Sequence, residues 1–193
     1  MISRLCLISL ALSCAAFAET VPVIAKITMT NQVVMGKSQR AVPVSITEGM
    51  LYRASDGSTL RQFKDRGELA TPHKFYELDY YGQRILELPH PQGVENYRGM
   101  KSLGEDTVAG IRCKLIAVEA QGPTDVSPKQ VGTACVSEEY GLMLRQDTSY
   151  PRKDGTVAHS IMELSNVQLH TEPDASVFAL PAGFSHPVNT DLH

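Results

Sequence analysis

Apolar and polar residues follow one another along this chain in short stretches that are separated by turn-forming residues. No stretch keeps a 3.6-residue repeat over three turns, so the pattern favours strands over helices. Stretches rich in Val, Ile, Thr and aromatic residues predict strands in the first half of the chain at residues 21–34, 44–53, 58–64, 74–80 and 83–88. Short connections such as Asp56-Gly57 join them, which predicts an antiparallel meander.

The second half of the chain continues the same pattern, but its strands are apolar on both faces. Strands are expected at residues 105–118, 130–136, 142–148 and 156–169. In the first of these, Cys113 and Leu115 lie on one face, while Ile116 and Val118 lie on the other. A sheet with one solvated face would alternate more cleanly. A strongly curved sheet around an apolar space and a two-sheet sandwich with a filled core both fit this pattern.

The first eighteen residues form a separate unit. A short cationic start ending at Arg4 precedes an uncharged apolar run over residues 5–17, and Ala16-Phe17-Ala18 is a small-x-small cleavage site. These features indicate a secretory signal peptide that is cut between Ala18 and Glu19. The alternative is a lipoprotein that is acylated at Cys14 and tethered to a membrane.

Composition points to a single domain without a nucleic-acid partner. Arg4 is the only charged residue of the leader, so the remaining 175 residues carry 17 Lys and Arg against 21 Asp and Glu, a net charge of −4. The charges are interspersed and form no basic stripe, which argues against nucleic-acid binding. No later segment is apolar enough for a transmembrane anchor. We therefore expect one domain over residues 19–186 and a flexible tail over residues 187–193.

Two cysteines, Cys113 and Cys135, remain after the leader is removed. An even pair in an exported protein is expected to form a disulfide. The two predicted strands around them flank a turn-rich segment, and a hairpin centred on Thr124 would place the two cysteines directly opposite each other. A redox-active pair is the alternative, but the C-x-x-C spacing that such pairs commonly have is absent.

No catalytic signature is present. The sequence lacks G-x-S-x-G, H-E-x-x-H, S-x-x-K, P-loop and G-x-G-x-x-G patterns. His159 and His170 lie on one predicted strand, but their odd separation sends them to opposite faces. We therefore expect no enzyme, no catalytic residue, no metal site and no cofactor.

The segment after the last strand predicts a compact cap on the sheet. Asp174 can cap a single helical turn, and Phe178 and Leu180 then point inward. Gly183 allows the chain to reverse before Phe184 docks. This segment is therefore expected to be part of the core.

The same segment, P-D-x-S-x-F-x-L-P-A-G-F over residues 173–184, resembles the ending of LolA-like periplasmic proteins, the superfamily of the outer-membrane lipoprotein carrier. Residues 52–61, 103–110 and 140–145 resemble further motifs of that group, including an uncharacterised secreted branch. The resemblance implies a mainly β fold with little helix, in which a curved antiparallel meander forms an incomplete β-barrel.

The resemblance also implies a function. An exported periplasmic protein would bind or carry a lipid or acyl chain in an apolar cavity that is lined by aliphatic and methionine side chains rather than by charges. No individual ligand-binding residue transfers from the family. The alternative function is a non-enzymatic structural or interaction module of the bacterial cell envelope, which would have a filled core, no ligand and a protein partner.

Overall fold

The computed structural model describes residues 20–35, 40–89, 100–120, 130–152 and 154–186. The proposed signal peptide, Cys14 and the C-terminal tail lie outside the described residues. The described part consists of β-strands and one short 3-10 helix. The strands are β1 (Val23–Met35), β2 (Arg40–Arg53), β3 (Thr59–Phe63), β4 (Arg66–Ala70), β5 (Phe75–Asp79), β6 (Arg84–Leu88), β7 (Ser102–Val108), β8 (Ile111–Ala120), β9 (Gln130–Ser137), β10 (Leu142–Pro151) and β11 (Val157–Leu169).

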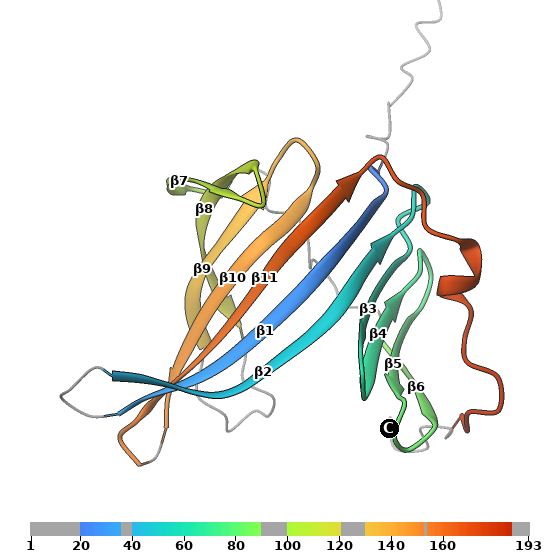
Figure 1. Ribbon diagram of the computed structural model, residues 1–193, viewed down its shortest axis with the longest axis horizontal. Helices are drawn as coiled ribbons and strands as arrows, with labels where there is room; N and C mark the ends of the chain where they lie inside the picture. Colours follow the sequence, from blue (N-terminus) through green and yellow to red (C-terminus); the bar gives the residue numbers. More distant parts are fainter. Residues whose placement is uncertain (1–19, 36–39, 90–99, 121–129, 153, 187–193) are drawn as a thin grey trace, which may run out of the picture.

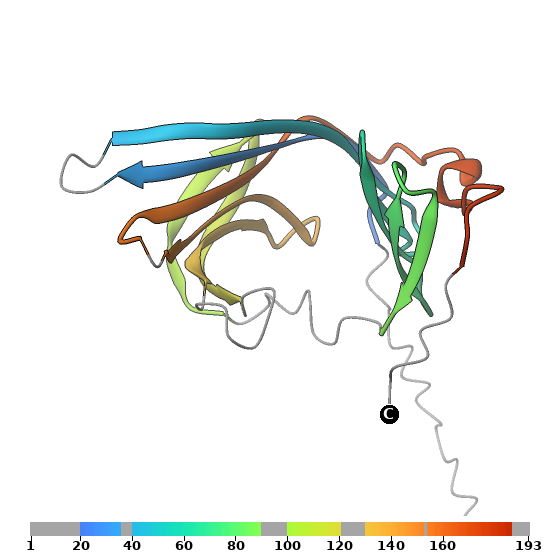
Figure 2. The same ribbon diagram turned by 90° about the horizontal axis from the view of Figure 1, so that it is seen from below.

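All of these strands belong to one antiparallel sheet with the order β6-β5-β4-β3-β2-β1-β11-β10-β9-β8-β7. Each strand pairs with its neighbours in sequence except β6 and β7, and β1 pairs with β11. The topology is that of a barrel that is open between β6 and β7. The sheet arches strongly (Figures 1 and 2), which confirms the predicted incomplete barrel and excludes a two-sheet sandwich for the described residues.

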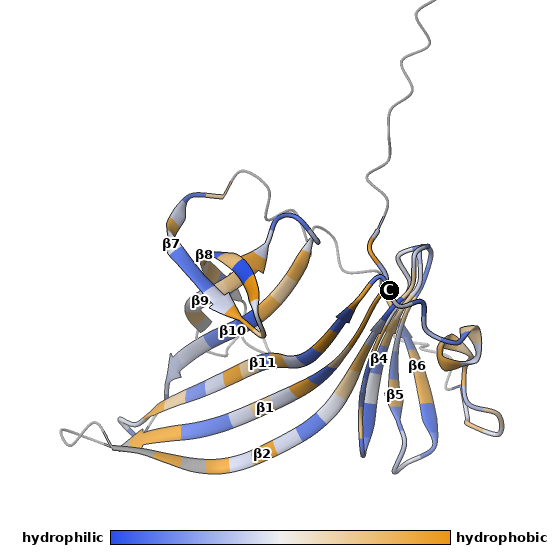
Figure 3. Cartoon of the chain, turned by 45° about the horizontal axis from the view of Figure 1, so that its top comes forward, coloured by the Kyte–Doolittle hydropathy of each residue, from blue (hydrophilic) through white to orange (hydrophobic). Residues whose placement is uncertain are grey.

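One predicted strand proved to be two strands, and one strand was missed. The expected strand over residues 105–118 is divided by a tight turn at Ala109-Gly110, whose φ angles of 51° and 80° are both positive, so β7 and β8 form a hairpin. Strand β4 was not predicted at all, although it pairs along its whole length with β5. Elsewhere hydrophilic and hydrophobic positions alternate visibly along β1, β2 and β11 (Figure 3).

The main apolar cluster, here called the concave core, gathers residues from β1–β3 and from β7–β11. Its buried members are Val23, Ala25, Ile27, Leu51, Phe63, Val108, Cys113, Cys135, Leu142, Leu144 and Leu164. Strands that are far apart in the sheet order can share one cluster because the sheet curves around it. Burying these side chains away from water provides the main driving force for the curved arrangement.

The C-terminal segment covers the opposite, outer face of β3–β6. Leu60, Leu69, Tyr76, Leu78 and Ile85 form a second cluster there, and Val177, Phe178, Leu180 and Phe184 pack against it. The predicted cap is confirmed, because Asp174 Oδ1 accepts the Ser176 N–H at 2.8 Å ahead of the 3-10 helix η2 (Ala175–Phe178). Phe178 itself is only half-buried.

The segment also extends the sheet at its β6 edge. The backbone of Ser185 exchanges 2.9 Å hydrogen bonds with the Ile85 N–H and the Gln83 carbonyl. Gly183 makes the predicted reversal with φ of 80°. The segment after β11 is therefore an integral part of the fold.

Cys113 and Cys135 form the expected disulfide, with their Cα atoms 5.3 Å apart. The predicted register was wrong, because Leu115 and not Cys113 lies opposite Cys135. This register pairs Ile116 with Ala134 inside a third buried cluster, whereas direct opposition of the cysteines would have set Ile116 against a glycine. The two cysteines are diagonal neighbours on one face, which leaves the Cα spacing within the range of a disulfide.

Replacing both cysteines by alanine is expected to lower the free energy of unfolding by about 3 kcal/mol, because the bond closes a loop of 22 residues and restricts the unfolded chain. Thermal unfolding of wild type and variant without reductant measures the difference. Adding reductant should lower the thermal midpoint of the wild-type protein to that of the variant. Two free thiols in the unreduced, denatured wild-type domain would contradict the assignment.

Candidate functional site

The inner face of the arch is the candidate site, and it has an apolar part and a charged part. The apolar part contains a narrow cavity of about 30 Å³. Its lining residues are Ile27, Leu51, Arg53, Thr59, Arg61, Gly141, Leu142, Met143, Met162 and Leu164. The lining is largely aliphatic and methionine, but it also includes Arg53 and Arg61, whereas a lining without charges was expected. The volume suits about one water molecule, so the expected acyl-sized cavity is not open at this position.

Arg53 is one of the residues that line this apolar cavity. Its side chain is 6% exposed, and its three nitrogens donate to three backbone carbonyls: Nε to Val21 at 2.9 Å, Nη1 to Gly141 at 2.7 Å and Nη2 to Tyr140 at 2.7 Å. The guanidinium thus ties the chain before β1, the end of β2 and the turn between β9 and β10. Residues 52–61 and 140–145, which the sequence singled out as separate motifs, meet at this side chain.

Replacing Arg53 by Met should lower the free energy of unfolding by about 3 kcal/mol, because three hydrogen bonds from a buried charged donor are lost. Arg61→Met is the matched control. Arg61 pairs with Glu68 at 3.3 Å in a partly exposed position, and such pairs contribute less than about 1 kcal/mol. Chemical denaturation of the two variants measures both values. If both variants lose the same free energy of unfolding, Arg53 stabilises the fold no more than Arg61 does.

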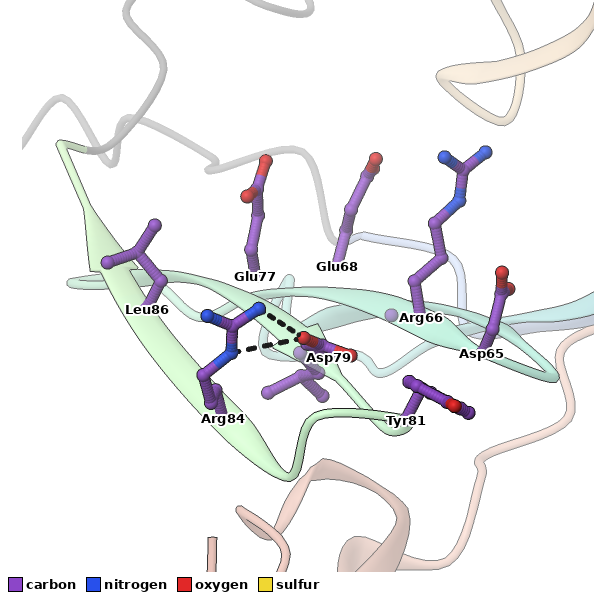
Figure 4. A pocket seen from close by; sticks show the side chains of 10 residues that line it. Asp65, Arg66, Glu68, Glu77, Asp79, Tyr81, Arg84 and Leu86 are labelled. Atoms are coloured by element: carbon purple, nitrogen blue, oxygen red, sulfur yellow. Dashed lines mark hydrogen bonds and ion pairs between the residues drawn. The ribbon is translucent and has the colours of Figure 1, made fainter. Parts of the chain in front are cut away.

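The charged part, here called the charged wall, is the inner face of β3–β6. It comprises the side chains of Arg61, Arg66, Glu68, Glu77, Asp79 and Arg84. A cavity of about 680 Å³ lies over it, lined by Asp65, Arg66, Gly67, Glu68, Glu77, Leu78, Asp79, Tyr81, Arg84 and Leu86. In Figure 4 Glu77, Glu68 and Arg66 project from one side of the sheet, while the C-terminal segment lies on the other side.

Cross-strand register places the charged wall on the same face as the concave core. Leu51, a member of that core, lies opposite Arg61, which lies opposite Glu68, which in turn lies opposite Glu77. Residues that are directly opposite in neighbouring strands point to the same side of the sheet. The inner surface therefore changes from apolar to charged along β3, which carries both Phe63 of the concave core and Arg61 of the charged wall.

Asp79 and Arg84 form the best-matched pair of the charged wall. Arg84 donates to Asp79 Oδ2 from Nε at 3.1 Å and from Nη2 at 2.7 Å, and the Gly82 N–H donates to Oδ1 at 2.7 Å. The Gly82 hydrogen bond, followed by the Arg84 contact, lowers the pKa of the Asp79 carboxyl. The ionised carboxylate therefore favours the folded state above the ordinary pKa of 3.8, and this contribution is lost as the pH falls through the lower folded pKa.

Glu77 and Arg66 remain unmatched in charge. Glu77 has no hydrogen bond or ion pair within the described part of the chain, and it lies directly opposite the like-charged Glu68. The Arg66 guanidinium lies 5.5 Å from the Phe63 ring centroid and 3.9 Å from the Met29 sulfur, and no carboxylate of the described residues pairs with it. The wall therefore holds one carboxylate and one guanidinium that are available to a ligand.

Replacing Glu77 by Gln should raise the free energy of unfolding by roughly 0.5 kcal/mol, because like charges directly opposite in a sheet repel each other. High salt should reduce this gain by screening the repulsion in wild type. Glu87→Gln is the control, because Glu87 lies on the outer face of β6 and accepts a bond from Lys74 at 3.1 Å. Urea titrations at low and high salt test this. A loss of stability in Glu77→Gln would contradict the unpaired state of this carboxylate.

Other candidate chemistry is sparse among the described residues. They contain no group of three or more His, Cys, Asp or Glu side chains that could hold a metal ion. His159 lies 3.6 Å from Asp147, whereas His170 packs edge-on against the Tyr140 ring. In the same part of the chain, no helix has both the length and the apolar character needed to cross a membrane.

Neither a model of a protein family nor a curated protein matches this sequence. Among solved structures, an uncharacterised conserved protein from Thermus thermophilus is similar at 10% identity with a TM-score of 0.46, over 84% of this chain and 89% of that one. A chain of the MucA/MucB complex from Pseudomonas aeruginosa is similar at 11% identity with a TM-score of 0.39, over 86% of this chain and 58% of that one. A LolA superfamily protein from Nitrosomonas europaea is similar at 9% identity with a TM-score of 0.39, over 83% of this chain and 91% of that one.

Proposed function

We propose that this chain is an exported, non-catalytic protein of the periplasm that binds the acyl chain of a lipid or lipidated ligand against its concave core. The observation that carries the proposal is the position of the core on the inner face of an open, single-layered sheet. Among the described residues, the single non-strand element lies on the outer face. The signal-like leader and the sequence resemblance support the same function.

The small volume of the apolar cavity is compatible with a site that opens when the ligand enters. Met143 and Met162 line the cavity, and Met29 and Leu115 pack partly buried beside the core. Methionine side chains are unbranched and adopt many rotamers at little cost. An acyl chain that displaces them gains about 0.8 kcal/mol for each methylene group that it buries.

A second candidate function, an interaction module, is favoured by one feature outside the arch. Val42, Val44 and Ile46 of β2 are 42%, 66% and 65% exposed. They lie before residue 49, where pairing with β3 begins, so this half of β2 is an open edge. Exposed aliphatic side chains along a free strand edge are suited to contact with another protein.

The two functions make different predictions for Met162→Glu. The mature protein is expected to bind a fluorescent fatty acid saturably, and the variant should weaken this binding at least about tenfold, because it places a carboxylate among apolar lining residues. Leu103→Glu is the control, since Leu103 is 57% exposed on β7. Fluorescence titration measures the affinities, and circular dichroism verifies that both variants fold.

Failure of wild type to bind the fatty acid would remove the acyl-binding proposal and leave the interaction module. A loss of binding in the Leu103→Glu control equal to that in Met162→Glu would show that the probe does not report on the concave core.

A further inference from the structure

We infer that the charged wall binds the zwitterionic headgroup of a lipid with a phosphate and a primary ammonium, such as phosphatidylethanolamine. This inference rests on the proposed function and adds the class of headgroup to it. The acyl chain would lie on the concave core, and the headgroup would fill the 680 Å³ cavity over β4–β6.

The apolar and charged parts of the inner face are continuous. Arg61 lines the narrow apolar cavity and donates to Glu68 at 3.3 Å, and Glu68 lines the large charged cavity. The side-chain pair therefore marks the boundary between the two cavities. One amphipathic molecule can occupy both only if its polar group follows directly after its apolar chain, as it does in a phospholipid.

Arg66 is placed to receive the phosphate at this boundary. Its guanidinium packs over Phe63, a member of the concave core, and against the sulfur of Met29. Neither contact neutralises the charge of the guanidinium. Its several N–H groups form a planar fork that matches a phosphate. The anionic part of the headgroup would thus bind beside the apolar floor.

Glu68 and Glu77 are placed to receive the ammonium further along the wall. They lie opposite each other on β4 and β5, and a cation between them would relieve their mutual repulsion. Arg66 and Glu68 are two residues apart on one strand, so their backbone positions differ by about 7 Å. Flexible arginine and glutamate side chains can close on a phosphate and an ammonium that are joined by a two-carbon linker.

Charge complementarity favours a zwitterion over either single charge. A purely anionic headgroup would bind Arg66 but would face the carboxylates of Glu68 and Glu77. A purely cationic headgroup would bind the two glutamates and leave Arg66 without an anion. Only a headgroup with both charges matches the two unmatched groups of the wall.

Displacement of the fluorescent fatty acid by three single-chain lipids of equal chain length tests this inference. Lysophosphatidylethanolamine is expected to compete at about tenfold lower concentration than lysophosphatidylglycerol or monoacylglycerol, with a preference that shrinks as salt is raised. Arg66→Gln and Glu77→Gln should each remove most of this preference and leave the competition by monoacylglycerol unchanged. Glu87→Gln, on the outer face of the same sheet, should behave as wild type.

Each of the other outcomes would contradict a specific part of the inference or of the proposed function. Equal competition by lysophosphatidylethanolamine and monoacylglycerol would overturn the headgroup site while the acyl-binding function stands. If lysophosphatidylglycerol competes as well as lysophosphatidylethanolamine, the proposed role of the ammonium and the two glutamates is overturned. If no acyl lipid competes and no fatty acid binds, the proposed function falls together with the inference.

Discussion

The length of one connection constrains the whole molecule. Strands β6 and β7 follow each other in sequence but form the two opposite edges of the sheet, and only the thirteen residues between Leu88 and Ser102 join them. Ten strand spacings in a flat sheet would separate these edges by about 48 Å, and the connection can reach at most about 50 Å when fully extended. Curvature shortens that distance. The same curvature gives the sheet an inside, and the concave core and the charged wall follow from it.

Arg53 stabilises this curved arrangement at one rim. A charged group buried to this degree is tolerated only when its hydrogen-bonding groups are satisfied. The three carbonyls that Arg53 contacts come from segments up to 120 residues apart, at Val21 and Gly141. A lysine could not satisfy them in the same way, because its single ammonium lacks the planar arrangement of donors that reaches all three.

The sequence predicted the meander, the disulfide and the C-terminal cap, but it did not predict β4 or the charged wall. Interpretation of strands assumes that apolar side chains face the inside of a sheet. In β3–β6 the apolar side chains lie on the outer face instead. The C-terminal segment covers Leu60 and Leu69 there, while Arg61 and Glu68 point into the arch. A five-residue strand with charges on its inner face resembles a surface loop in sequence. The register of the disulfide hairpin was missed because packing around Ile116, and not the cysteines, sets it.

The pairing of β1 with β11 determines when the domain can become complete. Val23 and Leu169 lie opposite each other although 146 residues separate them in sequence. In a chain that emerges N-terminus first into the compartment where it folds, β1 can pair with β2 early, but its other edge stays open until β11 has emerged. Pairing over such a distance is slow relative to hairpin formation, and an unpaired edge invites contact with other chains in the meantime. The last strand to emerge is therefore the one that removes the open edge of β1 and completes the sheet.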